Sequence, residues 1–142
     1  SNTKWKKIRN QFVPRYLIKN CKSKDGINWI RKNNISINFK DKTEMAITRP
    51  WLINVDKNKQ IMFFSIKKKN YKISYATSST SNKWVRTKKR IFSKNSMTNY
   101  DNISQEYASI VKIKNKLYMF YNGNNYGEKG ILLAVSNNND FR

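Results

Sequence analysis

The feature that most constrains the fold is an internal repeat of short segments. Residues 78–86 match residues 23–31 at an offset of 55, and both segments carry a tryptophan close to their end. A third, shorter copy starts at residue 136. Regular self-similarity at such a spacing is typical of architectures made from one supersecondary unit used several times. The chain is therefore expected to contain several copies of one unit.

The stretches between these tryptophan segments repeat as well. Residues 51–55 match 109–113, residues 61–65 match 118–122, and residues 71–78 match 130–136, at an offset of 57 or 58. Each stretch is short, rich in Ile, Val, Phe and Tyr, and bounded by turn-forming residues, which is typical of β-strands. Residues 57–59 and 114–116 are predicted to be tips of tight hairpins. The sequence therefore predicts an all-β fold built from four-stranded antiparallel units, as in propeller blades.

The chain holds a fractional number of such blades. Residues 44–92 are predicted to form one complete blade, residues 106–142 most of a further blade, and residues 3–34 the outer strands of a preceding one. Residues 1–142 would thus form a single partial domain of about two and a half blades, whereas closed propellers have about four to eight. We expect the missing blades to come from the same full-length protein or from a second copy in a homodimer.

Composition excludes several classes of site. The 142 residues include no His and one Cys, so a Cys/His zinc site, a His-ligated haem, a Ser-His-Asp triad and an internal disulfide cannot form within this chain. We expect no cofactor and no metal. The lone Cys21 lies in a strand-like pattern and is expected to be a buried small hydrophobic residue. The apolar runs are too short to span a bilayer, and without a visible signal peptide the expected location is the cytoplasm.

The formal net charge of +22 has two interpretations. A basic surface can release counterions from nucleic-acid phosphates. However, 23 Lys, 21 Asn and 16 Ile together are typical of an AT-rich genome, and the basic residues are dispersed in short runs. The second interpretation is favoured, and nucleic acid is an unlikely partner. In either case the charge favours anionic partners.

Alternation of strand direction predicts which side chains share one rim of the disc. Glu44 and Arg49 precede or begin one inner strand, and Glu106 begins the next. The loop 122–128 is expected at the same rim, while the turn 23–29 lies at the opposite one. Polar side chains at the start of inner strands point towards the central channel, where propellers bind ligands. An alternative for Glu44 is an ion pair with Arg49 that only fixes the start of the strand.

Two groups of segments resemble known families. Residues 23–29, Ser-Lys-Asp-Gly-Ile-Asn-Trp, resemble the Asp-box turn of sialidases and related propellers. Residues 44–51, 71–78, 107–111 and 117–127 resemble the pattern of five-bladed glycosidase propellers, which include glycoside hydrolase families 43, 32, 68 and 130. The resemblance covers about residues 16–136. It implies a partial five-bladed β-propeller that corresponds to the C-terminal half of a ring.

The resemblance also implies a function on carbohydrate. Hydrolysis or transfer at a glycosidic bond needs two carboxyl groups, and by position Glu44 and Glu106 are the candidate catalytic residues. A non-catalytic module that binds an anionic polysaccharide remains the alternative. Within the Asp-box-like turn, Asp25 is expected to bond its own turn and Trp29 to plug between sheets. The candidate substrate-binding residues are Arg49, Asp101, Tyr107, Asn122, Asn124 and Tyr126.

Overall fold

The computed structural model describes residues 2–8, 10–80, 82–92 and 96–137. It confirms the all-β prediction, because the only described helix, α1 (Asn124–Gly127), has four residues. Among the described residues no helix is long and apolar enough to cross a membrane. The strands are β1 (Asn2–Ile8), β2 (Gln11–Tyr16), β3 (Ile18–Lys19), β4 (Ile35–Ile37), β5 (Ala46–Asp56), β6 (Lys59–Lys67), β7 (Tyr71–Ser78), β8 (Val85–Arg86), β9 (Glu106–Ile113), β10 (Lys116–Asn122) and β11 (Ile131–Asn137).

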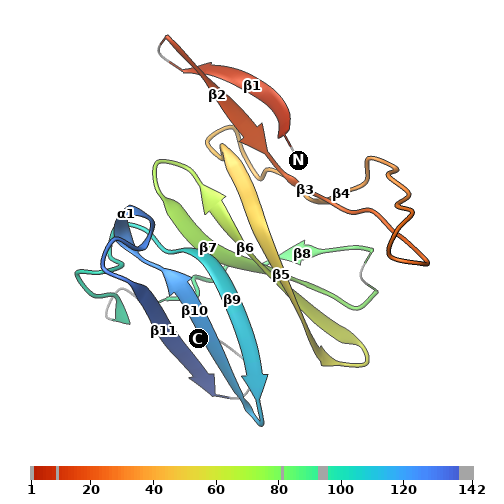
Figure 1. Cartoon of the computed structure of the whole chain (residues 1–142). Coiled ribbons are helices and arrows are strands. Elements are labelled where there is room, and N and C mark those ends of the chain that lie inside the picture. Colours follow the sequence, from red (N-terminus) through yellow and green to blue (C-terminus); the bar gives the residue numbers. More distant parts are fainter. Residues whose placement is uncertain (1, 9, 81, 93–95, 138–142) are drawn as a thin grey trace.

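The largest sheet has the strand order β1-β2-β5-β6-β7-β8. Strands β5 to β8 are the four antiparallel strands expected between residues 44 and 92, and the β5–β6 turn lies at the predicted hairpin tip. The β1–β2 hairpin joins this sheet through one parallel bridge between Tyr16 and Ala46. In Figure 1 this hairpin projects away from the rest of the chain.

Two smaller sheets complete the fold. Strands β9, β10 and β11 form a three-stranded antiparallel sheet, and the β9–β10 turn lies at the second predicted hairpin tip. Strands β3 and β4 pair as a separate two-stranded sheet. Residues 3–34 therefore contribute the β1–β2 hairpin, β3 and an isolated bridge between Lys22 and Ile30.

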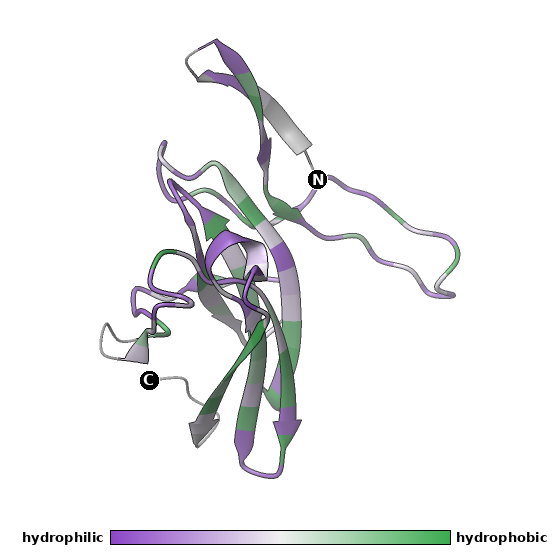
Figure 2. Cartoon of the chain, turned by 60° about the vertical axis from the view of Figure 1, so that its left-hand side comes forward, coloured by the Kyte–Doolittle hydropathy of each residue, from purple (hydrophilic) through white to green (hydrophobic). Residues whose placement is uncertain are grey.

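The main core lies between sheet β5–β8 and sheet β9–β11. Phe63 and Ile73 from the first sheet pack in one cluster with Leu117 and Met119 from the second. The Trp51 indole N–H also donates to the Ile110 carbonyl oxygen across the two sheets, at 2.9 Å. Figure 2 shows hydrophobic segments along both sheets and hydrophilic residues at the hairpin tips. Burial of alternate side chains therefore holds the two repeated units together.

The opposite face of the first sheet is also covered. Met62 and Phe64 of β6 pack with Ile18 of β3 and Ile37 of β4 in a second cluster. Strand β6 thus buries side chains on both faces, which explains why residues 61–64 form a continuous apolar run instead of an alternating one.

The Asp-box-like turn is formed as predicted only in part. Asp25 accepts hydrogen bonds from the backbone N–H groups of Ile27 and Asn28, at 2.9 and 2.8 Å. These bonds, that of Asn28 above all, hold the pKa of Asp25 well below its usual value. The predictions for Trp29 and Cys21 were wrong, since Trp29 is 53% exposed and Cys21 is exposed. The reason is visible in Figure 1, where the segment between β3 and β4 extends away from the sheets.

Candidate functional site

Three tyrosine rings gather at one rim of the two packed sheets. Tyr71 begins β7, Tyr107 is the second residue of β9, and Tyr126 lies in α1. Their ring centroids are 5.6 Å apart for Tyr71 and Tyr107, 6.2 Å for Tyr71 and Tyr126, and 6.3 Å for Tyr107 and Tyr126. Aromatic rings with partly exposed faces offer apolar area with a polar edge. We call Tyr71, Tyr107 and Tyr126 the tyrosine cluster.

Glu106 lies directly before Tyr107 and is almost fully buried. Its side chain is 2% exposed, and among the described residues its Oε2 atom has no hydrogen-bond partner. Burial raises the pKa of Glu106, whereas a hydrogen bond from Ser104 and the positive charge of Lys67 act in the opposite direction. A carboxyl group with a raised pKa keeps its proton to higher pH, as a proton donor in acid catalysis must. Most buried polar atoms have a partner, so the free oxygen marks this carboxyl as unusual.

Two cations border the tyrosine cluster. The Arg49 guanidinium carbon lies 5.4 Å from the centroid of the Tyr107 ring, and Lys67 Nζ lies 5.3 Å from that of Tyr71. Both distances are within the range of cation–π attraction. In the part of the chain that the structure describes, neither cation belongs to an ion pair. The rim of the cluster therefore carries two positive side chains that form no ion pair in the described part of the chain.

Each inner strand contains one residue with a positive φ, and in both strands this residue is a candidate site residue. Arg49 and Tyr107 have φ values of 54° and 59°, and they lie 58 positions apart, which is the repeat offset. The pairing of β5 shifts register between Thr48 and Trp51, as a bulge does. The Tyr107 N–H donates to Ser65 Oγ of β6 at 2.9 Å, so the irregular backbone of β9 is fixed to the neighbouring sheet.

Glu44 forms its ion pair with Arg86, and not with Arg49 as the alternative prediction had it. Its Oε1 and Oε2 atoms accept from Arg86 Nη2 at 2.8 Å and Nη1 at 2.9 Å, and Oε2 also accepts from the Lys40 N–H at 2.8 Å. Burial alone would raise the pKa of Glu44, but the Arg86 and Lys40 bonds outweigh it and lower the pKa below its usual value. Glu44 is thus an ionised anchor between the start of β5 and β8.

Asp101, predicted to bind substrate, is also engaged within the fold. It is 1% exposed, its Oδ2 accepts from the Tyr121 hydroxyl at 2.9 Å, and its Oδ1 accepts from the Thr98 N–H and hydroxyl. Burial and the bond to Asp101 raise the pKa of Tyr121. Glu44 precedes β5 and Asp101 precedes β9, so both repeated units have a buried carboxylate with intramolecular partners in the segment that leads into the inner strand.

The loop after β10 is held by its asparagines. Asn124 Oδ1 accepts from the N–H groups of Ile103 and Ser104, both at 2.9 Å, and its Nδ2 donates to the Asn99 carbonyl oxygen. Asn122 Nδ2 donates to the Tyr126 carbonyl oxygen at 3.2 Å. These contacts place Tyr126 beside Tyr107, so the two asparagines position the loop in this structure.

Sequence reasoning missed Tyr71 and Lys67. They lie at the two ends of the β6–β7 turn and are paired across it. By alternation of strand direction this turn shares the rim on which β9 begins, so the same topology argument that selected Glu106 would have selected both.

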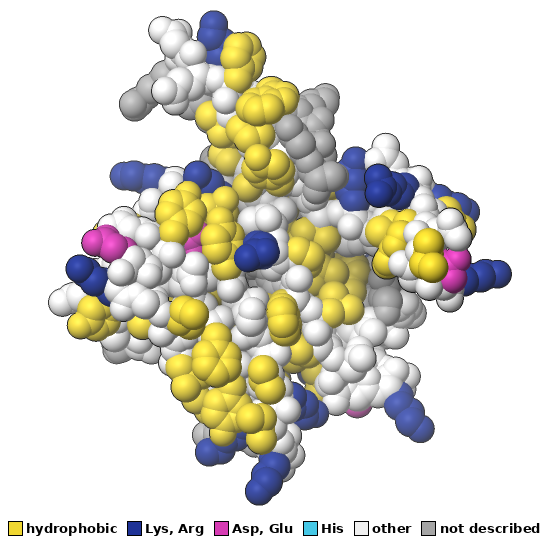
Figure 3. All heavy atoms as spheres, in the orientation of Figure 1, with side chains coloured by type: hydrophobic (Ala, Val, Ile, Leu, Met, Phe, Trp, Pro, Cys, Tyr) yellow, Lys and Arg dark blue, Asp and Glu magenta, His cyan; other side chains and the backbone are white. Residues whose placement is uncertain are grey.

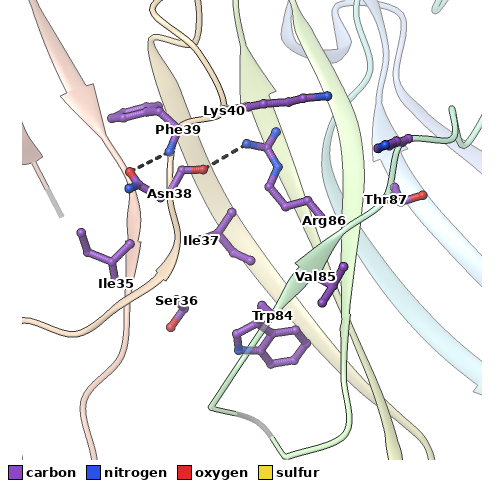
Figure 4. Close-up of a pocket in the computed structure, with 11 residues that line it drawn as sticks. Ile35, Ser36, Ile37, Asn38, Phe39, Lys40, Trp84, Val85, Arg86 and Thr87 are labelled. Atoms are coloured by element: carbon purple, nitrogen blue, oxygen red, sulfur yellow. Dashed lines mark hydrogen bonds between the residues drawn. The ribbon is translucent and has the colours of Figure 1, made fainter.

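A groove with a volume of about 550 Å³ lies elsewhere, between β4 and β8. Figure 4 shows Ile37 and Trp84 lining it, with Arg86 donating to the Asn38 carbonyl oxygen at 3.0 Å. The same Arg86 holds Glu44, so this groove adjoins the ion-paired anchor and not the tyrosine cluster.

Comparison with known sequences gives distant relatives. No family model matches the chain. It is 27% identical over 123 residues to "Uncharacterized protein Rv1502" of Mycobacterium tuberculosis, a match that covers 87% of this chain and 41% of the relative. "Uncharacterized protein MT1551", from another strain of that organism, matches equally. The chain thus spans about two fifths of the length of these relatives.

Solved structures share the fold. A protein named as a glycoside hydrolase superposes with a TM-score of 0.67 at 20% identity, over 90% of this chain and 37% of that one. The structure of BT0996 in an RGII complex superposes with a TM-score of 0.69 at 18% identity, over 94% of this chain and 39% of that one. At these identities the likeness shows a common arrangement of strands, and the function must be argued from the side chains.

Proposed function

We propose that the chain is part of a five-bladed β-propeller of the glycosidase type and binds carbohydrate at the tyrosine cluster beside Glu106. The observation that carries this proposal is the buried Glu106 carboxyl, whose Oε2 has no partner among the described residues and which directly precedes Tyr107 of the tyrosine cluster. Support comes from the fold shared with a protein named as a glycoside hydrolase. Sheets β5–β8 and β9–β11 would be two neighbouring blades.

The chemistry of the cluster suits a sugar. A sugar ring presents C–H groups on one face, which pack on aromatic rings, while its hydroxyl groups can bond to the tyrosine hydroxyls. The unpartnered oxygen of Glu106 would bond to a hydroxyl or to the glycosidic oxygen. Because burial raises its pKa, Glu106 is the better candidate for a general acid.

In the whole protein we further propose hydrolysis or transfer at a glycosidic bond. Both need a second carboxyl group as nucleophile or base. Glu44 and Asp101 are held by Arg86 and by Tyr121 with Thr98. We therefore assign the acid role to Glu106, and the second carboxylate to a part of the protein outside these residues.

A non-catalytic module for an acidic glycan is the second candidate. It is favoured by Arg49 and Lys67, which border the tyrosine cluster without an ion pair in the described part of the chain. An arginine can hold a carboxylate, sulfate or phosphate group through two parallel hydrogen bonds. In this case Arg49 would supply the specificity and Glu106 would only orient a hydroxyl.

Binding is tested with an array of neutral and uronate-containing oligosaccharides, followed by calorimetry on any glycan bound. Tyr126→Ala is expected to weaken binding about tenfold, because it removes one ring of the platform. Phe12→Ala is the control, since Phe12 is 66% exposed on the projecting β2 strand and should leave affinity unchanged. Equal losses of affinity in Tyr126→Ala and Phe12→Ala would refute carbohydrate binding at this cluster. An array without any bound glycan, together with binding of duplex DNA that depends steeply on salt, would refute it as well.

Catalysis is tested separately with Glu106→Gln in the full-length protein. The amide keeps the size of the side chain and loses the transferable proton, so turnover of a bound oligosaccharide should be lost while affinity is kept. Unchanged turnover would exclude Glu106 as the acid, and strong binding without turnover in the unmodified protein would favour the non-catalytic candidate. Arg49→Ala should then lower affinity for uronate-containing glycans more than for neutral ones.

A further inference from the structure

The outward face of sheet β9–β11 is apolar and exposed. Phe120 at the centre of β10 is 42% exposed, and Leu133, its partner on β11, is 53% exposed. Figure 3 shows hydrophobic side chains gathered over this part of the molecule. A contiguous apolar patch of this kind marks an interaction surface. We call it the outward face, and its exposed members are Val111, Phe120, Ile131, Leu133 and Val135.

The internal repeat relates the outward face to a surface of sheet β5–β8. Phe120 lies 57 positions after Phe63, and Leu133 lies 58 positions after Tyr75. Phe63 and Tyr75 are cross-strand partners on β6 and β7, as Phe120 and Leu133 are on β10 and β11. The two pairs therefore occupy the same place in their respective sheets.

The burial of these equivalent pairs differs. Phe63 is 2% exposed, because sheet β9–β11 covers it with Ala108, Leu117 and Met119. Phe120 has no equivalent cover in the described residues and stays 42% exposed. The second unit thus presents the surface that, in the first unit, receives the following sheet.

We propose that a further β-sheet of the same protein, outside these 142 residues, packs on the outward face. The mycobacterial relative has about 300 residues, since 123 residues are 41% of it, and the remaining part has room for further units of this size. The covering sheet would present apolar side chains, as Ala108, Leu117 and Met119 do in the cluster that contains Phe63. This proposal rests on the propeller architecture proposed above and does not depend on carbohydrate binding.

The test is the reaction rate of single cysteines with a maleimide. Cys21→Ser removes the thiol of these 142 residues, and any further native cysteine of the full-length protein is replaced by Ser. Leu133→Cys, Val135→Cys or Asn58→Cys is then introduced into the full-length protein and into the 142-residue chain. Asn58, at the exposed tip of the β5–β6 hairpin, is the control. In the full-length protein both face cysteines should react about tenfold more slowly than Asn58→Cys, whereas in the 142-residue chain all three should react alike.

Other outcomes overturn the proposal. Fast labelling of both face cysteines in the full-length protein would show that the outward face stays open. Protection in the 142-residue chain that rises with protein concentration, together with a doubled mass in sedimentation, would assign the face to a second copy instead. Circular dichroism of each variant separates protection from misfolding. Labelling and glycan binding are independent readouts, so failure of one does not imply failure of the other.

Discussion

The ion pair between Glu44 and Arg86 gives a prediction that separates a structural from a catalytic role. Glu44 is 2% exposed and the Arg86 side chain 18%, and three hydrogen bonds end on the Glu44 carboxylate. Glu44→Gln keeps the shape but leaves the guanidinium without its counter-charge. Breaking a buried pair costs about 3–5 kcal/mol, and the partial exposure of Arg86 places this one near 3 kcal/mol. For a chain of this size that lowers Tm by about 10 °C.

The measurement is urea unfolding followed by circular dichroism, with thermal unfolding beside it. Asp41→Asn is the matched control, because Asp41 pairs with Lys68 at 3.0 Å while both side chains stay about half exposed. An exposed pair contributes little, so this control should change the midpoint far less than Glu44→Gln. Because the pKa of Glu44 is lowered by folding, its contribution is present above the usual carboxyl pKa and is lost as pH falls through the lowered value.

Two results would refute this reasoning. If Glu44→Gln shifts the urea midpoint no more than Asp41→Asn does, the ion pair does not stabilise the fold. If Glu44→Gln keeps its stability and loses turnover or glycan binding, Glu44 belongs to the functional site after all. A double-mutant cycle with Arg86→Met isolates the pairwise contribution.

Two further predictions concern the neighbouring sheet. Because folding raises the pKa of Glu106, the protein loses stability as pH rises from the unfolded-state pKa towards the folded-state pKa. Glu106→Gln should therefore be more stable than the unmodified protein at neutral pH, and this advantage should be absent near about pH 4. A difference in urea midpoint that does not depend on pH would contradict this prediction. Gly123→Ala should lower the free energy of unfolding by about 2 kcal/mol, and with it Tm, because a Cβ at this position would overlap the Tyr100 carbonyl oxygen. An unchanged Tm would show that the loop relaxes freely.

The strands could be predicted from the sequence because their burial follows local patterns. Short apolar segments bounded by turn residues predict β7 and β11, and the Lys-Asn turns at 57–59 and 114–116 predict the two hairpin tips. Prediction was weaker at the projecting segment between β3 and β4. There Trp29 looks like a core residue by type, but its exposure depends on which segment covers it, and that is a tertiary property.

The candidate site could be predicted only where topology decides. Strand direction places Glu106, Tyr107 and Tyr126 at one rim, and the structure brings the two tyrosines together. The partner of Glu44 could not be derived in this way. Arg86 lies 42 residues away on a two-residue strand, and whether it reaches Glu44 depends on the packing of β8 beside the start of β5.

The comparison of the two repeated units is the best guide to which side chains serve function. A structural feature that both units share serves the fold. Glu44 and Asp101 are both buried carboxylates with intramolecular partners. Arg49 and Tyr107 share a positive φ. Where the units differ, folding alone does not demand the side chain. The position of Glu106 is occupied by Thr48 in the first unit, which forms its inner strand without a carboxyl group there. A buried carboxyl that its own fold can do without agrees with the proposal that Glu106 contacts a ligand.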